Sequence, residues 1–136
     1  MSGNRIINGN NFNCLNLRGL QLENFIGFYE GGLSEGINIL LIKFKEKNMW
    51  QCFFLDAGIG FWEEYDQVSA FEDYDVLAQI DIREKYRIGN SIVQSICCEG
   101  SSELLSELIF KFESVTLTLK YMDSEDLNSE TVLALL

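Results

Sequence analysis

Histidine is missing from this 136-residue chain, and its absence removes several kinds of chemistry. A Ser-His-Asp or Cys-His nucleophile system, a His-ligated zinc site and a histidine general base all need an imidazole ring. The cysteines contain no Cys-x2-Cys pair and lie in apolar or alternating segments, at Cys14, Cys52, Cys97 and Cys98. This spacing predicts no metal site and no cofactor, only reduced thiols that pack as small hydrophobic side chains.

Proline is also missing, and no apolar run approaches the ~20 residues that a membrane-spanning helix needs. Residues 1–11 carry no export-signal pattern, so we expect a cytoplasmic protein that does not contact membranes. Without proline, strand edges must be protected by charge, bulges or covering elements. The alternation of Lys43, Lys45 and Lys47 predicts an exposed strand face with this protective role.

Basic residues are few, because 10 Lys and Arg stand against 21 Asp and Glu, for a net charge of -11. Such a charge repels the phosphates of nucleic acids and attracts basic surfaces. We therefore expect no direct binding to DNA or RNA. A protein partner with a basic surface fits this charge better.

The residues that are present predict one folded domain, residues 1–136, because 47% of them are hydrophobic and 12% aromatic. Alternation with a period of two dominates and predicts strands over 12–17, 20–28, 37–45, 49–55, 76–82, 91–98 and 114–121. The glycine-containing segments 31–36 and 57–60 are expected to interrupt the strands. The fold class is thus mainly β (α+β), a twisted antiparallel sheet curled into a sandwich or partly open barrel with one or two short helices.

Two segments have ambiguous patterns. Residues 101–112 fit a helical stripe behind an N-cap at Ser102, but also a strand through Leu108, Phe110 and Phe112, and we favour a helix at the start. From Ser124 onward the chain is expected to form a short helix. Helices in these places would cover an edge or the mouth of the sheet.

An acidic and aromatic segment is the most distinctive feature of the sequence. Between Asn48 and Ile82 there are eight acids and no Lys or Arg. The central part interleaves aromatic rings with carboxylates, a composition suited to an interface with a basic partner. The candidate partner-binding residues are Trp62, Glu63, Glu64, Tyr65, Asp66, Glu72, Asp73, Tyr74 and Asp75. In the alternative interpretation, Phe61, Trp62, Tyr65 and Phe71 pack in the core and the acids form a solvated loop.

Paired carboxylates are the one catalytic possibility left. Asp56 with Glu63 and Glu64 could supply an acid and a base for glycosidic chemistry. Adjacent glutamates need not converge on one bond, however, and the domain is small for that reaction. We expect a protein that is not an enzyme and has no catalytic residues.

In its general character, the whole chain resembles the bacterial immunity proteins that neutralise nuclease-type toxins. The resemblance lies in the small, acidic, β-rich domain and in the patch Phe61-Trp62-Glu63-Glu64-Tyr65-Asp66. These proteins share no general motif, so no residue role can be transferred. The resemblance implies a cognate toxin whose basic cleft is blocked by the acidic surface. One alternative is a β-barrel carrier whose phenylalanines hold an apolar ligand. Another is a subunit of a larger assembly that uses an exposed strand edge. The sequence does not fix the oligomeric state.

Overall fold

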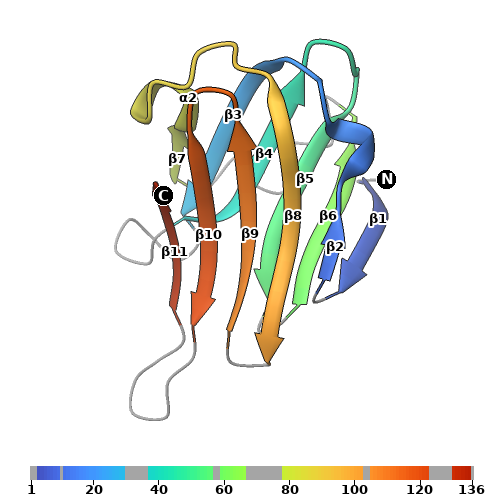
Figure 1. Ribbon diagram of the computed structural model, residues 1–136, viewed down its shortest axis with the longest axis vertical. Helices are drawn as coiled ribbons and strands as arrows, with labels where there is room; N and C mark the ends of the chain where they lie inside the picture. The colour runs from blue at the N-terminus through green and yellow to red at the C-terminus, as the bar shows by residue number, and fades with distance from the viewer. Residues whose placement is uncertain are drawn as a thin grey trace.

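The protein is a sandwich of two antiparallel sheets that face each other (Figure 1). The computed structural model describes residues 3–9, 11–29, 37–56, 59–66, 78–102, 105–122 and 130–135. One sheet has six strands in the order β1, β6, β5, β4, β3, β7, and the other has five in the order β11, β10, β9, β8, β2. The predicted mainly β fold is confirmed, and the open choice between sandwich and barrel is decided for the sandwich.

The strands of the six-stranded sheet are β1 (Gly3–Gly9), β3 (Leu22–Tyr29), β4 (Ile37–Phe44), β5 (Trp50–Asp56), β6 (Ile59–Tyr65) and β7 (Ala78–Asp81). The five-stranded sheet consists of β2 (Asn11–Asn13), β8 (Val93–Ser102), β9 (Leu105–Phe112), β10 (Thr116–Met122) and β11 (Glu130–Leu135). Two short helical segments, the 3-10 helix η1 (Leu15–Leu17) and α2 (Ile82–Lys85), join strands. Neither of them has the length or apolar character needed to cross a membrane.

The main core lies between the sheets and is built on contacts between aromatic rings. Phe53 of β5 meets Phe110 of β9 edge to face, with ring centroids 5.4 Å apart. Phe25 of β3 contacts the rings of Phe110 and Phe112 at 5.8 and 6.0 Å. All four rings are at most 2% exposed. These contacts join strands of both sheets, so the core holds the two layers together.

The other face of the six-stranded sheet is also buried in its middle. Phe28, Leu41, Trp50, Cys52 and Tyr65 form a second cluster there, and none of them is more than 7% exposed. A strand buried on both faces reads as a continuous apolar run, as Ile37–Phe44 does.

Strand β3 departs from the simple alternation that its sequence predicts. A strict period of two would place Leu20, Leu22, Asn24, Ile26 and Phe28 on one face, but the pairing with β4 shifts between Leu22 and Asn24. After this bulge, Phe25 joins Leu22 in the main core, while Phe28 belongs to the second cluster. The extra residue of a bulge changes which face the following side chains occupy.

Both predicted helices in the second half of the chain are wrong. Ser101 and Ser102 end β8, and residues 105–112 form β9, paired with β8 and β10; residues 103–104 lie outside the described chain. Residues 130–135 form β11, which pairs with β10 at six successive positions, while 124–129 are outside the described residues. In each case, hydrogen bonding to the adjacent strands of the sheet outweighs a local pattern that also fits a helix.

Three smaller expectations also need correction. Of the predicted strand 12–17, only residues 12 and 13 lie in a strand, β2 (Asn11–Asn13), because the chain then turns into η1. Ile59 and Gly60 do not interrupt the sheet but begin β6, and residues 57–58 and 31–36 lie outside the described part. The lysine alternation does not protect an edge, because β4 lies between β5 and β3.

Candidate functional site

Of the central part of the acidic aromatic segment, the structure describes strand β6, an interior strand between β1 and β5, and Asp66 directly after it. Asp56 of β5 pairs with Ile59, so two residues connect β5 to β6. Successive side chains of a strand point to opposite faces, and the segment is divided accordingly. Trp62 enters the main core, whereas Tyr65 belongs to the second cluster.

Trp62 is a core residue and is only 6% exposed. Its ring stacks on Phe53 with centroids 6.0 Å apart, and its Nε1 donates a 2.7 Å hydrogen bond to Oε1 of Gln51. A buried indole N–H needs such an acceptor, because a buried donor without a hydrogen bond costs free energy. The interpretation of Trp62 as an exposed anchor therefore fails, and the core alternative holds for it.

Gln51 links this contact to two half-buried charged side chains, Glu64 and Lys47. The side chain is 0% exposed, and its Nε2 donates to Oε2 of Glu64 at 3.0 Å and to the backbone carbonyl of Met49 at 3.4 Å. Nζ of Lys47, in the turn between β4 and β5, lies 3.4 Å from the same Glu64 oxygen. The carboxylate of Glu64 is therefore held by a buried amide on one side and a lysine on the other.

Tyr65 and Glu63 form a second polar contact at the same end of β6. The Tyr65 hydroxyl donates a 2.6 Å hydrogen bond to Oε1 of Glu63, and Tyr65 is 7% exposed. Phe61, two residues before Glu63, stacks on Phe54 of β5 with ring centroids 4.7 Å apart. Tyr65 is thus buried, like Trp62, while Asp66 directly after it is exposed.

The site residues predicted from sequence therefore fall into three groups. Trp62 and Tyr65 are buried, Glu63 and Glu64 are half-buried and hydrogen-bonded, and Asp66 is exposed. The remaining candidates lie outside the described residues, namely Glu72, Asp73, Tyr74 and Asp75, and so does Phe71 of the core alternative. Sequence reasoning missed Gln51 and Lys47. The available signal was Gln51 itself, a lone amide inside the apolar run that becomes β5.

Glu63 and Glu64 are not arranged as an acid and base pair. They occupy opposite faces of β6, since Glu63 contacts Tyr65 of the second cluster and Glu64 contacts Gln51 beside Trp62. Asp56 lies at the far end of the β5–β6 hairpin, paired with Ile59. Within the described ranges, no group of three or more Cys, Asp or Glu side chains is placed to hold a metal ion.

None of the four cysteines, all of which lie within the described residues, forms a disulfide, and Cys14, Cys52 and Cys98 are buried. Burial raises the pKa of Cys98 to about 11, and it also raises the pKa of Cys14. Cys97 is half-exposed, and its pKa is raised by burial and by the neighbouring carboxylates Glu99 and Glu107. Cys97 and Cys98 fall on opposite faces of β8, as their adjacency in a strand predicts. Thiols with raised pKa values are poor nucleophiles at neutral pH.

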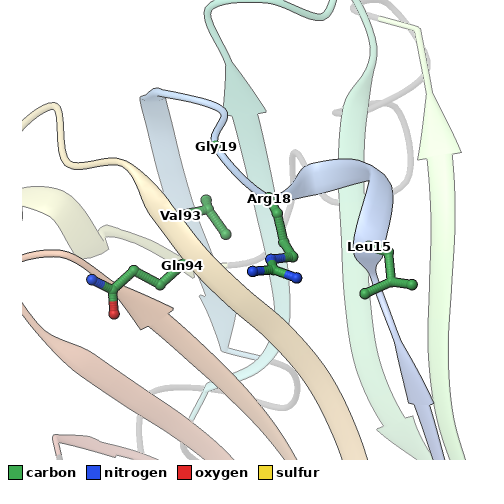
Figure 2. A pocket seen from close by; sticks show the side chains of 5 residues that line it. All are labelled: Leu15, Arg18, Gly19, Val93 and Gln94. Atoms are coloured by element: carbon green, nitrogen blue, oxygen red, sulfur yellow. The ribbon is translucent and has the colours of Figure 1, made fainter.

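A shallow recess lies between η1 and the start of β8 (Figure 2). It is lined by Leu15, Arg18, Gly19, Val93 and Gln94. Leu15 is 66% exposed, and Gly19 has a positive φ of 84°, a conformation that suits glycine. The recess is open and offers one cationic group, Arg18, which limits it to weak surface contacts.

Comparisons with known proteins add no family to this description. No protein-family model matches the chain, and neither the curated proteins nor the solved structures give a significant match.

Proposed function

We propose that the chain is a non-enzymatic inhibitor, a cytoplasmic immunity protein of bacterial competition that binds a cognate nuclease toxin. The observation that carries the proposal is the charge distribution. Carboxylates follow one another at Glu63, Glu64 and Asp66 and continue at Glu72, Asp73 and Asp75, with no Lys or Arg from 48 to 82. A nuclease needs a basic cleft for its substrate, and a surface of this charge is complementary to such a cleft.

The burial of the aromatic rings changes the roles within the proposed contact surface. Trp62 and Tyr65 support the strand from its two faces, while carboxylates meet the partner. Glu64 is held by Gln51 and Lys47, and Glu63, on the opposite face of β6, is held by Tyr65. A partner that meets one face of the strand therefore contacts one of the two, in a geometry set before binding. Side chains that are already ordered lose less conformational entropy on association. In the described chain, Asp66 is the carboxylate of this group that is exposed rather than half-buried.

A carrier of apolar ligands draws less support from the same observations. It would need phenylalanines around an internal space. Phe25, Phe53, Phe110 and Phe112 instead contact one another across the two sheets. We therefore keep a protein partner as the proposed ligand.

The test is binding to the purified toxin domain encoded next to this chain's gene, with two matched double variants. The first, Asp66→Lys with Asp73→Lys, reverses two charges of the proposed surface. The second, Glu99→Lys with Glu113→Lys, makes the same change in net charge at exposed positions outside this segment. We expect the first to weaken binding at least tenfold and the second less than threefold, because juxtaposed like charges act locally.

Three other results would contradict the proposal in different ways. Absence of binding by the wild-type chain would remove the toxin as partner. Equal losses in both double variants would mean that only total charge matters. An unchanged affinity of Asp66→Lys with Asp73→Lys would place the contact surface elsewhere.

A further inference from the structure

Strand β11 forms one end of the five-stranded sheet and pairs, among the described strands, with β10 alone. Its second edge therefore carries backbone N–H and C=O groups that another strand can bind. Val132 is 37% exposed and Leu135 51%, and Ala134 between them is also exposed. After Glu130 the strand has no charged residue and no glycine. Its register with β10 runs without a bulge.

The other three sheet edges of the described structure each have a feature that discourages pairing. Strand β1 contains Arg5 and a bulge between Arg5 and Ile7. Strand β2 has three residues, and β7 has four before the chain turns into α2. Short strands, charges and bulges are the usual means of protecting an edge. From Thr131 onward, β11 has no charge and no bulge, and its six residues make it longer than β2 or β7.

We propose that β11 pairs antiparallel with β11 of a second copy, forming a dimer with a continuous ten-stranded sheet across the seam. The composition of the strand selects this occupant. In a pairing centred on Leu133, Val132 faces Ala134 of the second copy and Thr131 faces Leu135, so every facing pair is uncharged. The twofold axis places the two Glu130 positions at opposite ends of the seam. Because the other edges are protected, assembly stops at two copies.

The net charge of the chain gives this dimer a distinctive dependence on salt. Two copies that each carry a charge of -11 repel one another, while the seam itself holds no charge. Salt screens that repulsion, with a Debye length of about 8 Å at physiological ionic strength. Dimerisation should therefore strengthen as salt rises. Binding to a basic partner through the acidic surface should weaken instead.

The experiment is sedimentation velocity of the full chain over a wide concentration range, with two variants. Val132→Glu places a carboxylate in the seam, and Val132 pairs with Lys120 of β10, so the new charge meets an opposite charge within the monomer. The matched control is Ile59→Lys, at another exposed strand position, where the paired residue is Asp56. We expect a concentration-dependent dimer for wild type and for Ile59→Lys, and at least a tenfold weaker dimer for Val132→Glu.

Circular dichroism and thermal unfolding will establish that each variant is folded. Should Val132→Glu fail to fold, Ala134→Glu makes the same test, since Ala134 is exposed and pairs with Thr118. A wild-type chain that stays monomeric up to about millimolar concentration overturns the proposal. Three further results would also overturn it. They are a dimer that persists in the folded β11 variants, a dimer that weakens as salt rises, and assembly that continues beyond two copies.

Discussion

Trp62 and Gln51 are joined across β5 and β6 by a buried hydrogen bond of 2.7 Å from the indole Nε1 to the amide Oε1. Gln51→Leu removes the acceptor and also the contact with Glu64, so we expect a loss of about 1–3 kcal/mol in the free energy of unfolding. Trp62→Phe removes the donor and leaves a small cavity, with a loss of similar size. The double variant should lose less than the sum, because neither partner then remains unmatched.

Urea denaturation of the two single variants and the double variant measures this coupling. The control is Gln79→Leu on β7, an exposed glutamine whose replacement should change stability by no more than about 0.5 kcal/mol. If the losses from Gln51→Leu and Trp62→Phe simply add in the double variant, the two side chains are not energetically coupled through this hydrogen bond.

Gly60 lies against Cys98 at the contact between the two sheets. A Cβ added at Gly60 would stand 2.5 Å from the Cys98 sulfur, closer than side chains tolerate. We expect Gly60→Ala to destabilise the fold by about 1–3 kcal/mol, as overpacking of a core does. Adding Cys98→Ala removes the sulfur and should recover part of the loss. Thermal unfolding of both chains measures the effect, and a Gly60→Ala chain as stable as wild type would show that the sheets can separate at low cost.

The cysteines make stability fall at alkaline pH. The pKa of Cys98 is raised by burial to about 11 in the folded chain, from an ordinary value of 9.0. Between these values the unfolded thiol loses its proton while the folded thiol keeps it. The unfolded state is thereby favoured, and stability decreases as pH rises through this window. Urea midpoints from pH 8 to about 11, compared between wild type and Cys98→Ala, test this; equal pH slopes would contradict it.

Alkylation should distinguish the thiols within the folded chain. Cys97 is half-exposed, whereas Cys14, Cys52 and Cys98 are buried. We expect iodoacetamide to label Cys97 first and slowly, because its own pKa is raised by burial and by Glu99. Peptide mass spectrometry over time gives the order, and early labelling of Cys14 would contradict the packing described.

If the proposed toxin complex forms, its association rate should fall as salt rises while its dissociation rate changes less. Long-range attraction steers the encounter and is screened by ions, whereas contacts in the bound state are shielded from them. Asp66→Asn should reduce the salt dependence of the association rate, because Asp66 is exposed. Glu113→Gln, exposed in the turn after β9, is the control. Stopped-flow measurements at several salt concentrations decide the matter, and a rate independent of salt would exclude electrostatic steering.

The alternation of side chains was sufficient to predict strands at most places where they occur. Thr116–Met122 follows this pattern closely, whereas Ile37–Phe44 was predicted as a buried strand from its largely apolar run. The same reasoning failed at 105–112 and 130–135, where apolar spacing fits either structure and pairing with β8 or β10 decides. For the acidic segment it located the carboxylates along the chain but not the environment of the rings. Trp62 and Tyr65 are buried because β6 is an interior strand between β1 and β5.

By itself, the sequence determined the β class of the fold, the absence of histidine chemistry and the location of the negative charge along the chain. These depend on residue type and on a period of two, which are local properties. Only the tertiary structure decided which face of each strand is covered, that Gln51 and Lys47 hold Glu64, and that β11 forms a sheet edge. A period of two shows that a strand has two faces, but the strands that pair beside it and the sheet that packs on it come from distant parts of the chain.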